Sequence, residues 1–590
     1  MADYDIGELK KKAENYRDAE KHPVFRKEVD DLLAAQSWDE LHERFYTTLS
    51  FGTAGIRGII GGGTNRINPL VVRTVSAALG RYMVSMTAPD ADPPSIVIAY
   101  DSRRYSDLFA REAALTLAAS GVHVYLFDTL HPVPLLSFAV RHLGALAGVV
   151  ITASHNPAAY NGYKVYWSDG AQVTPPHDKA IAEIITQVDV LDIPDMEETE
   201  ARASGRLESV PASVDNAYYE AVLASIRRPD AVRDIPVTVV YSPLHGSGNI
   251  PVRNLLERLG VTTIVVPEQE KPDGAFPTVA LPNPESAKAM EMALKLGKER
   301  KADIILGTDP DADRLGIAVP VSPDKSRYEL LNGNQIAILL FDYLAGCYSA
   351  LAKGRDDVPS AYPPGSGRKT PVLVKSIVTT DVVRRIAEDQ GIVCREVLTG
   401  FKYVAEELAV LEGSAGDARF FLFGAEESYG YLTVPFVRDK DAVSTAVVAV
   451  EMLCAHARRG ISLYERLHEI YREYGFSFEA VVSNDYAGSA GKQKMQEIME
   501  KFRGKTPGDV LLGSTIQEIV DYASGAVQGL PKADVLVFYL SGGVKLVVRP
   551  SGTEPKIKYY LFHTADHDMS ESVAREQFDC LVARIGKEHT

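Results

Sequence analysis

Short apolar runs alternate with helical patterns along most of this chain, and this alternation limits the folds open to it. Residues 95–100 are typical of a buried strand, residues 107–120 of a helix that ends at a glycine, and residues 122–127 of the next strand. The same rhythm returns from residue 237 onwards. Strands joined through helices pair in parallel, so the sequence predicts an α/β protein built on mostly parallel sheets.

The length of the chain calls for several such units. Its 590 residues correspond to about three to five domains at roughly 100–200 residues each. After about residue 474 the pattern changes, and strand-like runs between residues 535 and 562 precede a final helix over residues 570–585. This indicates a C-terminal domain with a mixed sheet. Segments 189–215 and 354–369 are rich in charged or turn-forming residues and are expected to be loops or linkers.

Charge and motif content disfavour several functions. The chain has 63 Lys and Arg against 79 Asp and Glu, a net charge of −16, whereas a nucleic-acid binder needs a basic face. No G-x-x-x-x-G-K-[ST] motif occurs, and the truncated G-x-G-x-x-G segment at 244–248 has Pro251 where the third glycine should be, so P-loop and nicotinamide enzymes are disfavoured. A basic cleft for a small anionic substrate remains compatible with the composition.

Cysteine usage and apolar runs bear on the compartment. The four cysteines lie far apart without a C-x-x-C pair, so neither a zinc nor a disulfide framework is expected, and a reducing, cytoplasmic compartment is favoured. The start of the chain lacks a signal-peptide pattern. The longest apolar stretches, such as 336–344 and 442–450, stop short of the roughly 18 residues of a membrane span, so no membrane association is expected.

Three apolar runs each lead directly into a polar loop. Residues 148–151 precede Thr-Ala-Ser-His-Asn-Pro, residues 303–306 precede Gly-Thr-Asp-Pro-Asp-Ala-Asp, and residues 420–423 precede Gly-Ala-Glu-Glu-Ser. Parallel sheets bind their ligands beyond the carboxyl ends of the strands. The three loops are therefore expected to face one cleft.

The acidic loop is the strongest metal-binding signal in the chain. Asp309, Asp311 and Asp313 occupy alternate positions, so in an extended loop their side chains point the same way. Three converging carboxylates repel one another unless a cation neutralises them, and ligation by oxygen alone suits Mg²⁺. Arg314 and Pro320 stand where an EF-hand needs glycine and glutamate, which excludes that motif. A solvated acidic turn is the alternative.

The serine loop suggests a nucleophile. Ser154 leaves a strand-like run beside His155, and Pro157 fixes the following turn. The loop lacks the G-x-S-x-G pattern, so acyl transfer is disfavoured. A serine near a divalent metal suits phosphoryl transfer, because the metal balances the charge of a phosphoserine. Taken alone, the Ser-His pair also fits a structural turn, and the acidic loop shifts the interpretation toward phosphoryl transfer.

A loop near the C-terminus has the groups of a phosphate cradle. Arg549-Pro-Ser-Gly-Thr-Glu-Pro offers a guanidinium, two hydroxyls and a backbone opened by glycine. Arg549 can bind a phosphate through two hydrogen bonds, while Ser551, Thr553 and backbone N–H groups reach its other oxygens. A hairpin turn with a surface arginine is an equal alternative for the isolated segment.

The Glu426-Glu427-Ser428 loop suits a sugar. A carboxylate and a hydroxyl recognise neighbouring sugar hydroxyls, and Lys402 and Lys440 suit a phosphate. Acidic pairs more commonly form a solvated surface, but the position directly after a buried strand favours a functional role.

Together these loops resemble the motifs of the α-D-phosphohexomutase family, which includes phosphoglucomutases and phosphomannomutases. The resemblance implies an α/β fold of four domains around a central cleft, three of them related α/β domains with mixed or parallel sheets and the fourth a smaller α+β domain. Residues 51–58 and 161–164 look most like the long subgroup of phosphoglucomutases and phosphopentomutases. The matching motifs are residues 152–157, 309–314, 425–428 and 549–556, and the implied domains span 1–205, 206–322, 323–465 and 466–590.

The resemblance also assigns roles to the matching positions. Ser154 would be the phosphoserine and would hold Mg²⁺ together with three carboxylates, those of Asp309, Asp311 and Asp313. Further groups would line the phosphotransfer site, namely Arg57, His155, Lys164 and Arg314. Sugar hydroxyls would be held by Glu426 and Ser428. The distal phosphate would be held by Arg549, Ser551, Gly552 and Thr553, with Lys402 and Lys440 as helpers.

The implied reaction interconverts glucose 1-phosphate and glucose 6-phosphate, with glucose 1,6-bisphosphate as intermediate and activator. The sugar stays open among glucose, mannose and pentose phosphates, and the general base between His155 and Lys164. A sugar-phosphate phosphatase is disfavoured by the distal cradle, and a non-catalytic sensor by the intact Ser154. The expected partners are small sugar phosphates, not nucleic acid or membrane, and the chain is expected to be a monomer or homodimer.

Overall fold

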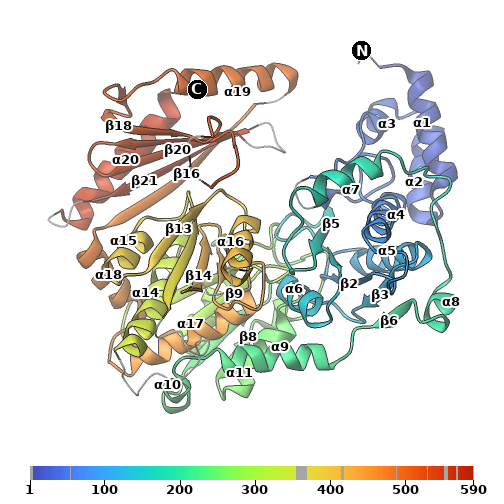
Figure 1. The fold of residues 1–590 in the computed structure, drawn as a ribbon. Coiled ribbons are helices and arrows are strands. Elements are labelled where there is room, and N and C mark those ends of the chain that lie inside the picture. The colour runs from blue at the N-terminus through green and yellow to red at the C-terminus, as the bar shows by residue number, and fades with distance from the viewer. Residues whose placement is uncertain are drawn as a thin grey trace.

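Four sheets follow one another along the chain, each within its own domain. The computed structural model describes residues 4–52, 55–353, 369–413, 418–486, 488–525, 527, 529–550, 556–565 and 569–588. Most of the expected loop at 354–369 lies outside these residues. In Figure 1 the N-terminal domain lies at the right and the C-terminal domain lies above the third domain.

The first sheet is mixed. Its parallel centre is β4-β2-β3-β6, and β5 and β1 add antiparallel to one edge. Segment 189–215, expected to be a loop or linker, contains helix α8 and strand β6; both are too short to show a hydrophobic period. In sheet order the strands are β1 (Gly55–Ile59), β5 (Tyr160–Trp167), β4 (Ala147–Ile151), β2 (Ser95–Tyr100), β3 (His123–Leu126) and β6 (Leu207–Ser209).

The second and third sheets repeat the arrangement of the first. The second has the order β11 (Tyr328–Leu330), β10 (Leu315–Pro320), β9 (Ile304–Thr308), β7 (Thr238–Ser242) and β8 (Thr262–Val265). The third has the order β13 (Val393–Val397), β12 (Thr370–Ser376), β14 (Arg419–Glu426) and β15 (Gly430–Leu432). In each sheet, the strand before the polar loop pairs in parallel with a central strand, and the strand after the loop returns antiparallel. The three predicted loops thus occupy equivalent positions in three related domains.

The C-terminal sheet is antiparallel throughout, so the expectation of a mixed sheet was wrong. Short turns join most neighbouring strands, and such connections allow only antiparallel pairing. The domain has a core of its own, which includes Phe538, Leu546 and Leu561, and a smaller apolar cluster around Ile377 and Tyr560 joins it to the third domain. Its strands are β16 (Ser477–Asp485), β21 (Lys556–Thr564), β20 (Val544–Pro550), β19 (Leu536–Leu540), β18 (Ser514–Asp521) and β17 (Val510–Leu511).

Helices cover the sheets and precede them at the N-terminus. The first domain has α1 (Ile6–Ala19), α2 (Pro23–Ala34), α3 (Trp38–Phe45), α4 (Pro69–Ser85), α5 (Ser106–Ala119), α6 (Val133–His142), α7 (His177–Ile185) and α8 (Glu198–Ala203). The second has α9 (Ser213–Ala224), α10 (Pro229–Asp234), α11 (Asn249–Arg258), α12 (Pro267–Glu270) and α13 (Glu291–Arg300). The third has α14 (Gly333–Ala352), α15 (Val382–Asp389), α16 (Lys402–Gly413), α17 (Ala442–Ala457) and α18 (Leu463–Tyr474). The fourth has α19 (Gly488–Arg503) and α20 (Glu571–Glu588).

Helix α14 is longer and more apolar than the sequence pattern indicated. By length and composition alone its 20 residues could cross a membrane, although the sequence analysis expected an apolar stretch of only residues 336–344. Of its most apolar window, 67% is buried inside the protein, and the helix packs against β14 and α15. Burial in the core of the third domain accounts for its composition.

Candidate active site

A cavity of about 630 Å³ lies where the four domains meet. Each domain supplies part of its wall, so the strand-end loops do face one space. The predicted site residues that line it are Arg57 and His155 from the first domain, Arg314 from the second, Lys402, Glu426 and Ser428 from the third, and Arg549 from the fourth. Ser551, Gly552 and Thr553 lie outside the described residues.

The three aspartates converge as the spacing predicted. One ligand oxygen from each of Asp309, Asp311 and Asp313 lies within 4.8 Å of the others, and all three side chains are buried. One oxygen of Asp311 and one of Asp313 are buried without a hydrogen-bond partner. Burial and the neighbouring carboxylates raise the pKa of Asp309 and Asp313. Uncompensated buried oxygens of this kind fit a hard divalent cation.

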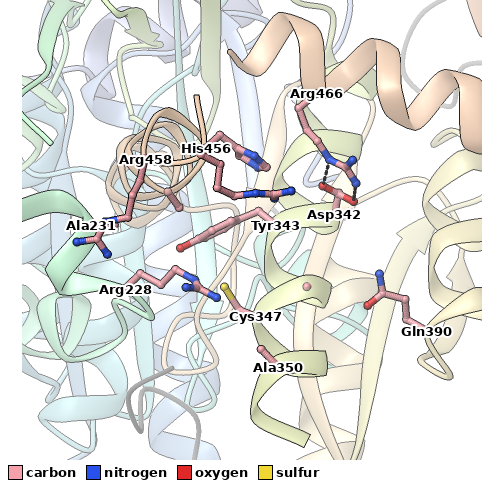
Figure 2. A pocket seen from close by; sticks show the side chains of 13 residues that line it. Arg228, Ala231, Asp342, Tyr343, Cys347, Ala350, Gln390, His456, Arg458 and Arg466 are labelled. Atoms are coloured by element: carbon pink, nitrogen blue, oxygen red, sulfur yellow. Dashed lines mark hydrogen bonds and ion pairs between the residues drawn. The ribbon is translucent and has the colours of Figure 1, made fainter. Parts of the chain in front are cut away.

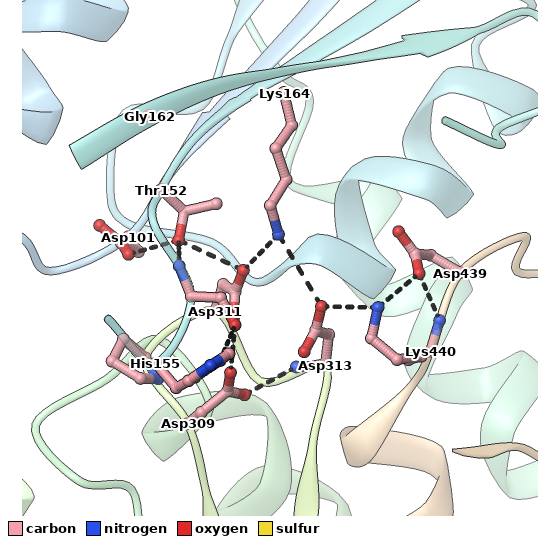
Figure 3. A network of polar contacts seen from close by, with 12 residues as sticks. Asp101, Thr152, His155, Gly162, Lys164, Asp309, Asp311, Asp313, Asp439 and Lys440 are labelled. Carbon is pink, nitrogen blue, oxygen red and sulfur yellow. Dashed lines mark hydrogen bonds and ion pairs between the residues drawn. The ribbon is translucent and has the colours of Figure 1, made fainter. Parts of the chain in front are cut away.

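Two lysines border the acidic cluster (Figure 3). Lys164 Nζ lies 2.9 Å from Asp311 Oδ2 and 3.8 Å from Asp313 Oδ2, and Lys440 Nζ lies 3.0 Å from Asp313 Oδ2. Burial opposes the charge of Lys164, but the two aspartates raise its pKa, so it is protonated at neutral pH. Lys440 was expected to help hold the distal phosphate; the structure instead places its ammonium against Asp313 and Asp439.

Ser154 lies at the end of β4 with its hydroxyl in the acidic cluster. Its Oγ donates to Asp309 Oδ2 at 2.7 Å and lies 3.1 Å from Nδ1 of His155. Its φ of 51° is left-handed, a conformation that costs roughly 1–2 kcal/mol for a residue with a Cβ. Backbone strain at a single residue of this kind is typical of functional positions.

Buried partners that the sequence analysis missed hold the serine loop in place. The guanidinium of Arg103 donates to the carbonyl oxygens of Ser154 and Asn156, and to that of Pro157 at 3.0 Å. Thr152 Oγ1 accepts from Ser154 N at 2.8 Å and donates to Asp101 Oδ2 at 2.6 Å. Asp101 and Arg103 directly follow β2, so they too come from a loop at a strand end, the signal by which they could have been found.

His155 is held neutral. Burial, together with the nearby charge of Arg314, lowers the pKa of its imidazole to about 2. The guanidinium of Arg314 is itself ion-paired with Glu285, and its backbone N–H donates to Asp309 Oδ1 at 3.1 Å. The wall beside the serine thus carries Arg57, the ion-paired Arg314 and one uncharged imidazole.

The opposite wall has two carboxylates and, on a pair of neighbouring strands, two basic side chains. Glu426 Oε1 accepts from the backbone N–H of Gly400 at 2.7 Å, and burial raises the pKa of its carboxyl. Burial and the charge of Glu426 raise the pKa of Glu427 to about 7. Arg549 on β20 stands opposite Lys558 on β21, and both line the cavity. The wall therefore offers acceptors for hydroxyls beside donors for a phosphate.

Comparisons with known proteins agree with this site. Residues 48–191, 216–322 and 332–474 match the alpha/beta/alpha domains I, II and III of phosphoglucomutase/phosphomannomutase. The chain is 37% identical to a phosphoglucomutase of Staphylococcus epidermidis over 556 residues, 91% of this chain and 95% of that protein. It is 36% identical to one of Staphylococcus aureus over 547 residues, 90% of this chain and 93% of that protein.

Solved structures share the fold. A putative phosphomannomutase from Thermus thermophilus superposes with a TM-score of 0.65 at 22% identity, covering 92% of this chain and 99% of that chain. The open form of parafusin, a phosphoglucomutase from Paramecium, gives 0.66 at 16% identity, with 92% and 95% covered.

The relatives and the domain matches define an enzyme, an isomerase that transfers a phosphoryl group within its substrate. The chain belongs to the phosphoglucomutase/phosphomannomutase family, and its activity is of the phosphoglucomutase type. The expected family and α/β fold are thereby confirmed.

Proposed function

We propose that the protein interconverts glucose 1-phosphate and glucose 6-phosphate through a phosphoserine at Ser154. The observation that carries the proposal is the position of the Ser154 hydroxyl. It lies 2.7 Å from Asp309 within a buried acidic cluster and 3.1 Å from His155, which lines the same cavity as Arg549. The two staphylococcal relatives are phosphoglucomutases, which favours glucose over mannose or a pentose. A phosphatase would not need the second phosphate-binding wall across the cavity, and a sensor would not need the Ser154 nucleophile.

The charge of each residue beside Ser154 determines its role in phosphoryl transfer. Mg²⁺, held by Asp309, Asp311, Asp313 and the phosphate on Ser154, would neutralise charge on the phosphoryl group as it transfers. Arg57 and Arg314 stabilise the same charge from the cavity wall. Lys164 is already protonated, and His155 is neutral but only weakly basic with its pKa lowered to about 2, so neither is a strong acceptor for the proton of the attacking hydroxyl.

The second wall keeps the sugar in the cavity between the two transfers. Glu426 and Ser428 accept sugar hydroxyls, while Arg549, Ser551, Gly552 and Thr553 hold the phosphate that is not reacting, with Lys402 beside them. Glucose 1,6-bisphosphate, formed by the first transfer, turns so that its other phosphate faces Ser154. The same molecule acts as activator, because it rephosphorylates an enzyme that has lost its phosphate.

The proposal extends to the setting of the reaction. We place the domain boundaries near residues 210, 322 and 475 rather than 205, 322 and 465, because β6 belongs to the first sheet and α18 to the third domain. We expect a monomer or homodimer that works in the cytoplasm on small sugar phosphates.

A comparison of substrates tests the assignment of the sugar. In a coupled assay with glucose, mannose and deoxyribose 1-phosphates, we expect the highest kcat/KM for glucose 1-phosphate. The expected margin is about tenfold or more, the value of one differently placed hydroxyl contact. A higher kcat/KM for either of the other sugars would reassign the substrate while leaving the phosphoserine mechanism in place.

Arg549→Ala tests the distal cradle. We expect kcat/KM to fall by about 10- to 150-fold, because one charge-assisted contact to the remote phosphate contributes on the order of 1.5–3 kcal/mol. KM should rise and kcat should fall, since binding energy at the remote phosphate orients the reacting hydroxyl.

The control for Arg549→Ala is phosphorylation of Ser154 by acetyl phosphate, which has no sugar and should be nearly unaffected. Lys501→Ala, on the exposed side of α19, should leave both reactions unchanged. Equal losses with both donors, or no loss with either, would show that Arg549 does not hold the distal phosphate.

A further inference from the structure

A second cavity, of about 550 Å³, lies between α10, α14, α17 and α18 (Figure 2). It shares no lining residue with the candidate active site. Its size falls within the range of sites that hold small metabolites, roughly 300–1,000 Å³. Four arginines line it, namely Arg228, Arg458, Arg459 and Arg466, and Asp342 is the only acidic residue among the described residues of its lining.

Three of these arginines already have partners. Arg466 makes two hydrogen bonds to Asp342, at 2.7 and 2.9 Å, and Arg458 pairs with Asp230 and Asp234 at the rim. The Arg228 side chain contacts the thiol of Cys347. Arg459 makes no ion pair with any residue that the structure describes. The arrangement therefore holds three guanidinium groups in place and leaves one cation at the mouth of the cavity.

The polar groups inside the cavity are the second, independent observation. His456 is 5% exposed, and neither of its ring nitrogens has a hydrogen-bond partner among the described residues. Oε1 of Gln390 is buried and unpartnered in the same way, whereas the hydroxyl of Tyr343 faces the buried carboxylate of Glu451. Figure 2 shows His456 and Tyr343 between α17 and α14, with their rings 6.3 Å apart. Buried polar groups are nearly always satisfied, so three such atoms around one cavity point to a ligand.

The chemistry of these groups selects the ligand. A guanidinium at the mouth favours a phosphate, which it can bind through two hydrogen bonds. The amide oxygen of Gln390 needs a donor, and the burial that lowers the pKa of His456 to about 4 leaves its imidazole with one donor and one acceptor. Hydroxyl groups satisfy both kinds of partner. We propose that this cavity binds a small phosphate ester that also carries hydroxyl groups.

Two helices connect this cavity with the candidate active site. Helix α17 has His456 near its C-terminal end, and at its other end the N–H of Ala442 donates to the carbonyl of Ala312 in the acidic loop. Its 16 residues span about 24 Å. Helix α14 carries Tyr343 and begins at Gly333, where an added Cβ would lie 1.8 Å from the carbonyl oxygen of Glu427. A ligand between the two helices thus rests on elements whose other ends touch the active-site loops.

Hydrogen exchange with two probes, glycerol 3-phosphate and 6-phosphogluconate at millimolar concentration, tests the proposal on the full chain. We expect at least one of them to protect segments 342–350 and 455–466. Inorganic phosphate has no carbon-bound hydroxyl groups and glycerol has no phosphate, so each should protect these segments at least about tenfold more weakly. Protection confined to the peptides of the candidate active site, or none with either ester, would overturn the proposal.

Variants locate the binding. Arg459→Glu and His456→Phe should each weaken protection of the two segments at least about tenfold, the loss expected for one charge-assisted or buried hydrogen bond. Arg472→Glu, an exposed arginine on α18 that does not line the cavity, is the matched control and should change nothing. If Arg472→Glu weakened the protection as much as Arg459→Glu, the effect would come from general surface charge, and the proposed binding site would be wrong.

The readout is independent of the proposed reaction. Arg459→Glu should keep its kcat/KM for glucose 1-phosphate within about twofold in the absence of the probe, because Arg459 does not line the candidate active site. If glucose 1-phosphate proved not to be the substrate, protection of segments 342–350 and 455–466 would still be observed.

Discussion

Ser154→Ala should abolish turnover, with kcat at least about 10³-fold below that of the unsubstituted enzyme. No other described hydroxyl donates to Asp309, so nothing replaces the nucleophile. The fold should be retained, because alanine and serine meet the same backbone strain at a φ of 51°. The measurements are steady-state kinetics with glucose 1-phosphate, thermal unfolding, and intact mass.

Intact mass connects the loss of activity to the phosphoserine. A fraction of the unsubstituted enzyme should be heavier by one phosphate, and Ser154→Ala should lack this species. Ser204→Ala, an exposed serine at the end of α8, should keep both the phosphate and the activity. Near-normal turnover in Ser154→Ala, or a phosphate that persists in it, would exclude Ser154 as the nucleophile.

Removing the metal should have the other large effect. Excess chelator should suppress turnover to about 1% or less, and added Mg²⁺ should restore it, because the buried carboxylates would otherwise repel the phosphate. Asp311→Asn removes one ligand charge and should lower kcat at least about 100-fold at saturating Mg²⁺. The measurements are activity as a function of free Mg²⁺ and calorimetric titration of the chelated enzyme.

The control for the metal prediction is Asp324→Asn, which lies on an exposed turn after β10 and should titrate like the unsubstituted enzyme. Asp311→Asn should remain folded, since it lessens repulsion among three buried acids. Full activity in excess chelator would contradict the metal assignment of the whole cluster.

Local sequence predicted the parts of the site that depend on local geometry. The alternate aspartates converge because one loop carries all three, and Ser154 reaches them because β4 and β9 end in equivalent positions of related sheets. A strand that is buried on both faces appears in the sequence as a continuous apolar run. Because the polar loops of the site follow such runs directly, their positions could be predicted from this sequence alone.

Contacts between distant segments were not predictable in this way. Lys440 lies in a turn before α17, and only the packing of the third domain on the second brings its ammonium to Asp313. Arg103 holds the serine loop from a different strand end, and its partners are mainly backbone carbonyls, which have no sequence signature. The C-terminal sheet was misassigned as mixed because strand direction depends on pairing, and pairing is not a property of a single strand.

The C-terminal domain carries Arg549 on a body with its own core, joined to the third domain through a smaller apolar cluster. The position of Arg549 in the cavity thus depends on this interdomain cluster as well as on the fold of each domain. Mild heat or denaturant that loosens this interdomain cluster should abolish turnover while the main core of each domain stays intact. For the same reason, a compound that binds between the third and fourth domains and separates them would inhibit the enzyme without resembling a sugar phosphate.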